Sequence, residues 1–238
     1  NNVLGSMAKD GKHFFYVNPL EVWPEASARN RDRHHVKPVR QKWFGCSCCP
    51  PNVARLIGSL NDYIYGVSDD GGTVYAHLFI GSEATFELDG RLVTLQQRSE
   101  LPSNGRVEFR VALPEGGDDA AFELALRVPN WFQSGRPELR INGETLRYRM
   151  ENGYARIGRS WSDGDVLEWL LPLETKLIAA HPRIRADAGK AAIPRGPLVY
   201  CIEEADNGAP LASLSLAAEP NLSERFDPDV LGGCVMVE

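Results

Sequence analysis

The sequence predicts an α+β protein of more than one domain, in which one amphipathic helix is followed by mainly antiparallel β-sandwich structure. Apolar residues recur at helical spacing after Asn52, and after Gly66 they alternate with polar residues instead. Turn sequences then recur about every 8 to 12 residues, which is typical of antiparallel sandwiches rather than of strands joined by crossover helices. The length of 238 residues, 43% of them hydrophobic, is sufficient for such cores.

The overall charge excludes several classes of partner. A formal net charge of −6 gives no general attraction to nucleic acid or to an anionic membrane surface. No apolar run approaches the ~20 residues that span a bilayer. We therefore expect neither nucleic acid nor a membrane as a partner.

Both ends of the sequence are typical of a piece of a longer protein. The chain begins without Met inside a segment expected to be ordered, and it stops on the strand-like run 234–238. The absence of a signal peptide therefore says nothing about the parent. The 5 cysteines include a C-x-C-C cluster that cannot form a paired disulfide framework. Reduced or metal-bound thiols favour a cytoplasmic location.

The first 41 residues are expected to be irregular, with short extended pieces. Residues 12–17 have strand composition, and Asn18-Pro19 would end that strand. The segment 29–40 is basic and polar and contains adjacent His34 and His35. We interpret it as a solvated loop, since a functional role would require it to lie over a pocket.

A helix is predicted directly after the cysteine cluster. Two prolines followed by Asn52 suit a helix start, and Gly66 is placed to end the helix. The apolar residues share one face: Val53, Leu56, Ile57, Leu60 and Ile64. Cys48 and Cys49 then lie at the helix N-terminus, where unpaired N–H groups favour an anion and lower a thiol pKa.

Period-two alternation predicts a series of strands after the helix. These are expected at 73–80, 84–89, 91–98, 106–113, 122–129, 138–141, 154–157 and 166–171. Asp89-Gly90 and Asn142-Gly143 are predicted hairpin turns. A second β-rich segment begins near residue 173, with strands at 175–180 and 196–202, and 205–228 is interpreted as loop.

Tryptophans in the predicted strands could form a sugar-binding platform, but such residues mostly fill cores. We therefore expect Trp131, Trp161 and Trp169 to be core residues. His77 and His181 are interpreted as ordinary sheet and loop residues rather than metal ligands.

The stretch 43–52 concentrates the chemistry of the chain, because three of its cysteines lie within four positions: Cys46, Cys48 and Cys49. Adjacent thiols can be buried small hydrophobes, ligands of a soft metal or, for one of them, a nucleophile. Structural zinc sites usually add a second pair of ligands elsewhere. Cys201 and Cys234 stand alone, so Cys48 and Cys49 supply at most half of a tetrahedral site.

Zinc coordination would deprotonate a thiol and hold it in position, as a nucleophile attacking an anomeric carbon requires. A wholly structural zinc clip is the alternative. Spacing alone leaves both open.

Two motifs resemble a known family. The run Phe14-Phe-Tyr16-Val-Asn18-Pro19-Leu20, followed later by Trp43, Gly45, Cys48-Cys49-Pro50 and Asn52-Val-Ala-Arg55, is similar to glycoside hydrolase family 127, the β-L-arabinofuranosidases. The segments 126–131, 141–143 and 194–200 also resemble the β-domains of that family. The double cysteine followed by proline is the specific part.

The resemblance implies a fold in three parts. Residues 1–65 would be the C-terminal portion of an (α/α)6 catalytic barrel, 66–172 a β-sandwich domain, and 173–238 part of a second β-sandwich. It also implies a retaining double displacement in which a zinc-bound cysteine attacks the anomeric carbon and a glutamate acts as acid and then base.

Carried over to this chain, Cys48 matches the nucleophile and a zinc ligand, Cys49 matches a second zinc ligand, and Tyr16 matches a residue lining the sugar subsite. Cys46 matches no assigned role. The resemblance thus implies Zn²⁺ as cofactor and a β-L-arabinofuranosyl or related glycoside as substrate, with a homodimer left open.

One departure is serious. The family's remaining zinc ligands, a glutamate and a cysteine two residues apart, and its acid/base glutamate lie upstream of Asn1, and no Glu-x-Cys occurs here. The chain alone is therefore expected to be inactive. A carbohydrate-binding or structural β-sandwich module with a cysteine zinc clip is the alternative. A redox thiol protein is disfavoured because no C-x-x-C lies in a βαβ setting.

Overall fold

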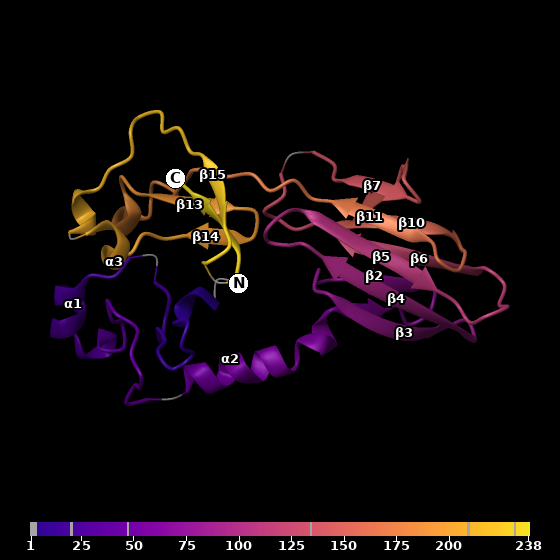
Figure 1. The fold of residues 1–238 in the computed structure, drawn as a ribbon, viewed down its shortest axis with the longest axis horizontal. Helices are drawn as coiled ribbons and strands as arrows, with labels where there is room; N and C mark the ends of the chain where they lie inside the picture. The colour runs from indigo at the N-terminus through magenta and orange to yellow at the C-terminus, as the bar shows by residue number, and fades with distance from the viewer. Residues whose placement is uncertain (1–3, 20, 47, 134, 209, 231) are drawn as a thin grey trace. The chain divides into compact units, whose positions relative to one another are not determined.

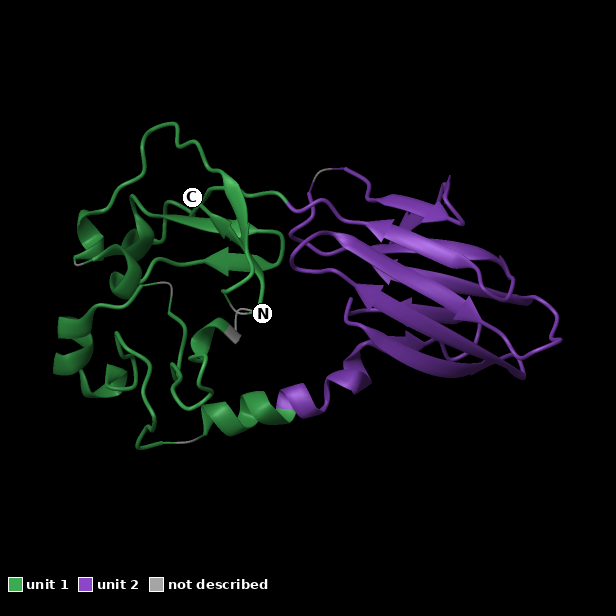
Figure 2. Cartoon of the chain, viewed as in Figure 1, with its two compact units in different colours: residues 1–55, 174–238 green, residues 56–173 purple. Residues whose placement is uncertain are grey.

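The chain is mostly β-sheet with few helices and divides into two compact units. The computed structural model describes residues 4–19, 21–46, 48–133, 135–208, 210–230 and 232–238. One unit combines residues 1–55 with 174–238, and the other comprises residues 56–173 (Figure 2). No helix in these described ranges is long and apolar enough to cross a membrane.

The unit of residues 56–173 contains two β-sheets (Figure 1). The first has the strand order β1 (Tyr65–Val67), β2 (Thr73–Ala76), β6 (Ala120–Arg127), β10 (Tyr154–Trp161) and β9 (Arg149–Glu151). The second has the order β3 (Ser82–Leu88), β4 (Arg91–Ser99), β5 (Arg106–Ala112), β11 (Val166–Leu170), β7 (Glu138–Ile141) and β8 (Glu144–Thr145). Every described pairing in these sheets is antiparallel except the parallel pair of β2 and β6.

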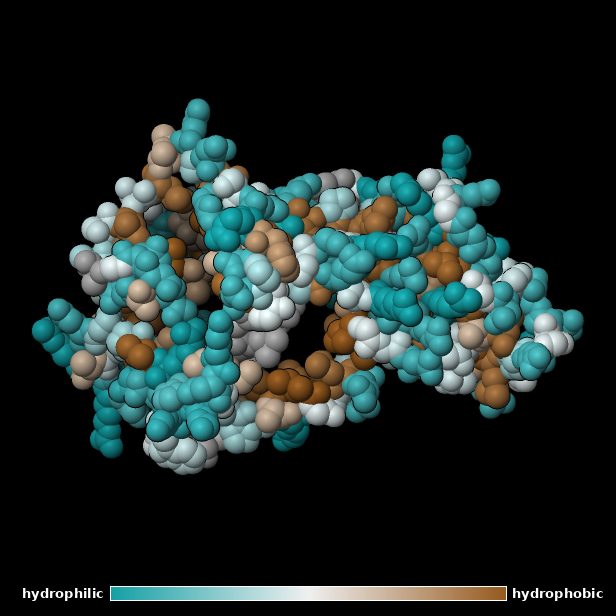
Figure 3. Space-filling model, viewed as in Figure 1, coloured by the Kyte–Doolittle hydropathy of each residue, from teal (hydrophilic) through white to brown (hydrophobic). Residues whose placement is uncertain are grey.

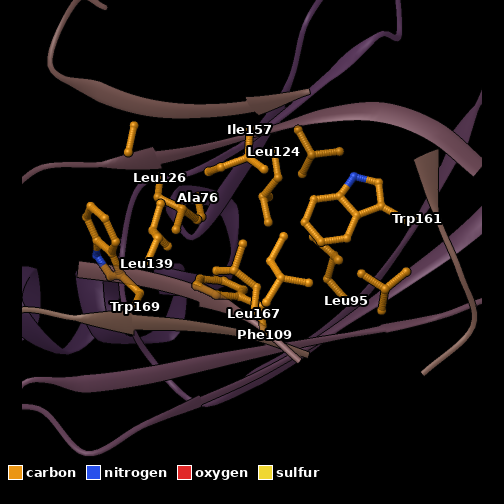
Figure 4. Close-up of a cluster of buried hydrophobic side chains, with 14 of the residues drawn as sticks. Ala76, Leu95, Phe109, Leu124, Leu126, Leu139, Ile157, Trp161, Leu167 and Trp169 are labelled. Carbon is orange, nitrogen blue, oxygen red and sulfur yellow. The ribbon is translucent and has the colours of Figure 1, made fainter. Parts of the chain in front are cut away.

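The core of this unit lies between the two sheets, because alternate residues of each strand point inward. Figure 4 shows side chains from both sheets meeting there, among them Leu124 and Phe109. Trp161 and Trp169 are fully buried, and Trp131 packs against the same cluster. The expectation that these tryptophans fill core is confirmed.

The predicted hairpin turns are confirmed by backbone geometry. Asp89 and Gly90, between β3 and β4, have φ values of 49° and 72°. Asn142 and Gly143, between β7 and β8, have φ values of 51° and 85°. Positive φ at both central positions matches the right-handed twist of the flanking strands.

The other unit carries shorter elements. Its strands form a sheet of β12 (Ile178–Ala179), β13 (Ala191–Arg195) and β14 (Leu198–Tyr200) and a pair of β15 (Glu224–Asp227) and β16 (Cys234–Val237). Its helical segments are η1 (Leu4–Ser6), α1 (Pro24–Arg29), η2 (Arg31–Arg33), η4 (Arg185–Asp187), α3 (Glu204–Asn207) and η5 (Leu211–Ser213).

Two expectations for this unit are wrong. The segment 205–228 is not all loop, because β15 lies in it and pairs with β16. Residues 12–17 do not form a strand, since only Phe14 makes bridge pairings there. A run of strand-forming residues becomes a strand only where an edge of matching length is available for pairing.

The predicted helix is shorter than its apolar stripe. Helix α2 (Cys49–Gly58) ends at Gly58, the 3₁₀ segment η3 (Leu60–Tyr63) follows, and Gly66 lies in β1 rather than ending the helix. Glycine and serine at 58 and 59 are weaker helix formers than their neighbours. Leu56 and Ile57 are 52% and 53% exposed, and Figure 3 shows hydrophobic side chains along α2.

Candidate active site

Tyr16 is positioned by a short backbone ladder in the unit of residues 1–55 and 174–238. Phe14 forms antiparallel bridges with Met7 on one side and Gln41 on the other. The Phe14 and Gln41 N–H groups each donate to the other residue's carbonyl at 3.0 Å. This pairing brings two segments that are distant in sequence beside each other.

The aromatic side chains next to this ladder form a small cluster around Phe44. Phe44 is only 7% exposed, and its ring centroid lies 5.3 Å from that of Phe14 and 5.1 Å from that of Tyr16. Tilted contacts at this separation are favourable for aromatic pairs. The Tyr16 ring is therefore fixed by packing, with its hydroxyl directed toward the cysteines.

Tyr16 and the three clustered cysteines come together. The Tyr16 hydroxyl lies 2.8 Å from Cys48 Sγ and 3.5 Å from Cys46 Sγ. Cys48 Sγ in turn lies 3.4 Å from Cys46 Sγ and 3.7 Å from Cys49 Sγ. The structure thus brings Tyr16, Cys48 and Cys49 together, the three residues for which a role was predicted.

The start of α2 holds the cysteine loop. Cys49 is the first helical residue, so Cys48 immediately precedes the helix, as expected. The Asn52 side chain donates to the Cys48 carbonyl at 2.5 Å, and Arg55 donates to the Asn52 amide oxygen at 2.5 Å. Two prolines in the first turn cost no backbone hydrogen bond there.

The thiol pKa moves opposite to the direction expected from the helix N-terminus. The Tyr16 hydrogen bond lowers the pKa of Cys48, but the Cys46 and Cys49 thiols and desolvation together raise it by more, so the net pKa lies above its ordinary value. Hydrogen bonds to the sulfurs of Cys46 and then Cys48 raise the pKa of Tyr16. Hydrogen bonding with the neighbouring thiols favours the neutral form of Cys48, and charge repulsion from Cys46 adds a smaller increase in its pKa.

The donor set fits a soft metal in part. Two sulfur ligands of one tetrahedral zinc ion, each about 2.3 Å from it, lie about 3.8 Å apart. Cys48 Sγ and Cys49 Sγ are 3.7 Å apart, which matches that edge. In the part of the chain that the structure describes, no group of three His, Cys, Asp or Glu side chains is arranged to hold a metal ion. Cys48 and Cys49 would therefore supply at most two ligands of such a site.

A pocket of about 170 Å³ adjoins the cysteines. Its lining residues are mainly aromatic and basic: Tyr16, His34, His35, Lys37, Trp43, Phe44, Gly45 and Cys46. The interpretation of segment 29–40 as a solvated loop is therefore incomplete, because His34, His35 and Lys37 line this pocket. The His35 ring also makes an edge contact with Tyr16, with centroids 5.5 Å apart. In the sequence, the adjacent histidines were the signal for this pocket.

This arrangement places the Cys48 thiol against the Tyr16 hydroxyl, next to a pocket that Tyr16 and Cys46 line. A thiol becomes a nucleophile when it is deprotonated by a base, a positive charge or a metal. None of the residues lining the described pocket is acidic, so this pocket supplies no carboxylic acid for protonating a leaving group.

Comparisons with known proteins identify the family. The family model described as the GH127 β-L-arabinofuranosidase catalytic domain matches residues 1–62. The models of the GH127 middle domain and the family 127 C-terminal domain match residues 73–173 and 175–229. The chain belongs to glycoside hydrolase family 127.

Several relatives are similar along nearly the whole chain. A non-reducing end β-L-arabinofuranosidase of Bifidobacterium longum subsp. longum is 40% identical over 243 residues, covering 100% of this chain and 36% of that protein. The crystal structure of a GH127 β-L-arabinofuranosidase from Geobacillus stearothermophilus T6 is 46% identical with a TM-score of 0.86, covering 98% of this chain and 36% of that one.

The GH127 β-arabinofuranosidase BT3674 is 30% identical with a TM-score of 0.80, covering 100% of this chain and 37% of that one. The chain thus spans little more than a third of the length of these relatives.

Proposed function

We propose that the whole protein containing this chain is a retaining glycosidase that releases β-L-arabinofuranosyl or related sugars through Cys48. One observation carries the proposal. Within the segment matched by the catalytic-domain model, the Tyr16 hydroxyl lies 2.8 Å from Cys48 Sγ, and Cys49 Sγ is 3.7 Å from that sulfur. The relatives named as β-L-arabinofuranosidases support the substrate class.

The proposed reaction has two displacements at the anomeric carbon. In the first, the Cys48 thiolate forms a C–S bond while the glycosidic C–O bond breaks, and the leaving oxygen takes a proton from a glutamic acid. In the second, water loses a proton to that glutamate and attacks the same carbon, and Cys48 leaves as thiolate. Two inversions retain the configuration. The glutamate belongs to a part of the protein outside this chain.

Cys48 and Cys49 are the residues that would hold zinc, with the remaining ligands outside this chain. Bound zinc would keep the coordinated Cys48 and Cys49 thiols deprotonated at neutral pH. Tyr16 lines the sugar subsite and hydrogen-bonds to Cys48. That contact lowers the Cys48 pKa, in opposition to the neighbouring thiols.

The proposal extends to the rest of the chain. Residues 1–65 would complete an (α/α)6 barrel, and residues 66–172 and 173–238 would form two β-sandwich domains, in a cytoplasmic protein. The barrel assignment is supported by Leu56 and Ile57 of α2, whose apolar side chains are exposed here and would be covered by a further layer of helices. The isolated chain would be inactive because it lacks the acid/base glutamate and half of the zinc ligands.

Release of p-nitrophenol from p-nitrophenyl β-L-arabinofuranoside tests this function. The whole protein and its Cys48→Ser variant are assayed, with zinc content measured on both. We expect turnover in the first and a loss of at least about 10³-fold in the second, because an alkoxide is far harder to generate than a thiolate. A near wild-type rate in Cys48→Ser would refute the nucleophile assignment.

A further inference from the structure

An ion pair connects the two sequence segments of the unit that carries the cysteines. Arg40 and Glu203 are 163 residues apart in sequence, yet two guanidinium nitrogens of Arg40 donate to the two carboxylate oxygens of Glu203, each at 2.9 Å. The side chains are 23% and 34% exposed. Paired parallel hydrogen bonds of this kind fix orientation as well as distance.

The same guanidinium holds the N-terminal segment. It donates to the Gly5 carbonyl at 2.7 Å and lies over the Phe15 ring, with the guanidinium carbon 4.6 Å from the ring centroid. The guanidinium that Glu203 holds therefore contacts the N-terminal segment at two points, the Gly5 carbonyl and the ring of Phe15, which directly precedes Tyr16. A guanidinium stacked on a ring and paired with a carboxylate has little freedom to move.

Continuous contacts lead from this ion pair to the nucleophile. Arg40 directly precedes Gln41, whose backbone pairs with Phe14 in both directions at 3.0 Å. Phe14 and Tyr16 both pack on the buried Phe44 ring, and the Tyr16 hydroxyl reaches Cys48. Every contact on this route lies within one compact unit.

We infer that Glu203 is a positioning residue for the cysteine site, acting through Arg40 to hold Tyr16 against Cys48. The inference rests on the proposed function, since it assigns the chain's C-terminal part a role in the rate of that reaction. In Glu203→Gln a neutral amide replaces the carboxylate, so Arg40 loses the paired charge-assisted hydrogen bonds while its contacts with the Gly5 carbonyl and the Phe15 ring remain. The Phe14–Gln41 ladder then loses part of its lateral support. Displacements of about 1 Å at a reacting centre can cost up to about 100-fold in rate.

The chain provides a matched control. Lys190 forms an ion pair with Glu21 and lies 5.8 Å from the Trp23 ring centroid, so it also joins the C-terminal and N-terminal segments of this unit. This pair is more exposed, at 42% and 41%, and none of its described contacts leads to Phe44 or Tyr16. Glu21→Gln therefore removes a similar tie without touching the route.

The test uses the whole protein and p-nitrophenyl β-L-arabinofuranoside, with kcat, KM and melting temperature measured for each variant. We expect Glu203→Gln to lower kcat by about 10-fold with KM within about 2-fold, and Arg40→Lys to act likewise. Glu21→Gln should leave kcat within about 2-fold. The melting temperatures of Glu203→Gln and Glu21→Gln should be similar, which separates positioning from loss of folding.

A double-mutant cycle on kcat distinguishes a positioning role of Glu203 from a purely structural one. If Glu203 acts through Tyr16, Glu203→Gln combined with Tyr16→Phe should be no slower than the slower single variant. Two results would overturn the inference while leaving the proposed function intact. One is a double variant whose loss of kcat equals the product of the two single losses, and the other is an equal kcat for Glu203→Gln and Glu21→Gln. An unchanged rate in Cys48→Ser would overturn both.

Discussion

The Tyr16 hydroxyl lies 2.8 Å from Cys48 Sγ, although 32 residues separate them in sequence. Cys46 Sγ lies farther from this hydroxyl, at 3.5 Å. A hydroxyl at this distance stabilises a thiolate by a charge-assisted hydrogen bond.

Tyr16→Phe should therefore slow the reaction while leaving the fold unchanged. The ring still packs on Phe44, but Cys48 loses the Tyr16 hydrogen bond, which lowers its pKa. Loss of this hydrogen bond leaves the thiolate less stabilised, so we expect kcat to fall by about 10-fold. Tyr63→Phe, at a 54% exposed tyrosine, is the control. Equal kcat values for Tyr16→Phe and Tyr63→Phe would show that the Tyr16 hydroxyl has no role in the reaction.

Cys49→Ser should mainly cost zinc. Serine is a much poorer ligand for zinc than a thiolate, and the Cys48–Cys49 sulfur separation of 3.7 Å matches one edge of a zinc tetrahedron. The metal content of the purified whole protein, measured by mass spectrometry, should fall well below that of wild type. Cys201→Ser changes an exposed thiol elsewhere and should retain full zinc. Full zinc in Cys49→Ser would show that this residue is not a ligand.

His77 should make the stability of the β-sandwich unit depend on pH. Burial first, and then the charge of Arg127, lowers the pKa of His77 below its ordinary value of 6.5. The unfolded chain therefore takes up a proton near pH 6.5 while the folded chain does not. The stability contribution is present above pH 6.5 and is lost as the pH falls through the folded pKa.

Thermal unfolding followed by tryptophan fluorescence checks this, because Trp161 and Trp169 are buried in the unit. When the pH is lowered from about 7.5 to about 5.5, the melting temperature of His77→Phe should fall by less than that of wild type. His181→Gln, at an exposed histidine, should follow wild type. An identical pH slope in His77→Phe and wild type would contradict the assignment.

Gly105→Ala should destabilise the same unit strongly. A Cβ at Gly105 would lie 1.7 Å from the Leu171 carbonyl oxygen, and the Leu171 N–H donates to the Gly105 carbonyl at 2.9 Å. The backbones must separate, which we expect to cost about 2 kcal/mol or more of unfolding free energy. Gly81→Ala is the matched control, since its nearest contact is an ordinary 3.8 Å. Equal denaturation midpoints for both variants would contradict the packing argument.

Local patterns in the sequence predicted the β-sandwich unit well. Alternation of apolar and polar residues located most of its strands, and Asp89-Gly90 and Asn142-Gly143 located two hairpin turns. These features depend on neighbours in sequence. The helix start at the prolines was also predictable, whereas its end at Gly58 was not, because the apolar stripe continues to Ile64.

Features that depend on long-range pairing escaped prediction. Strand β13 contains Pro194, which reads as a break, yet its carbonyl accepts a hydrogen bond from Lys176 N–H at 2.9 Å. Strand β15 has a single apolar residue, Phe226, and forms because it faces Val235 on β16. The approach of Tyr16 to Cys48 likewise follows from pairing between distant segments. The family resemblance suggested both residues, but no spacing rule placed them together.

The most direct test of the account is to locate the sugar during turnover. The whole protein is mixed with p-nitrophenyl β-L-arabinofuranoside, denatured while the reaction proceeds, and digested for peptide mass mapping. The account predicts one arabinosyl group on the peptide containing Cys48, attached to its sulfur and absent from Cys48→Ser. An arabinosyl ester on a carboxylate side chain, with Cys48 unmodified, would contradict it.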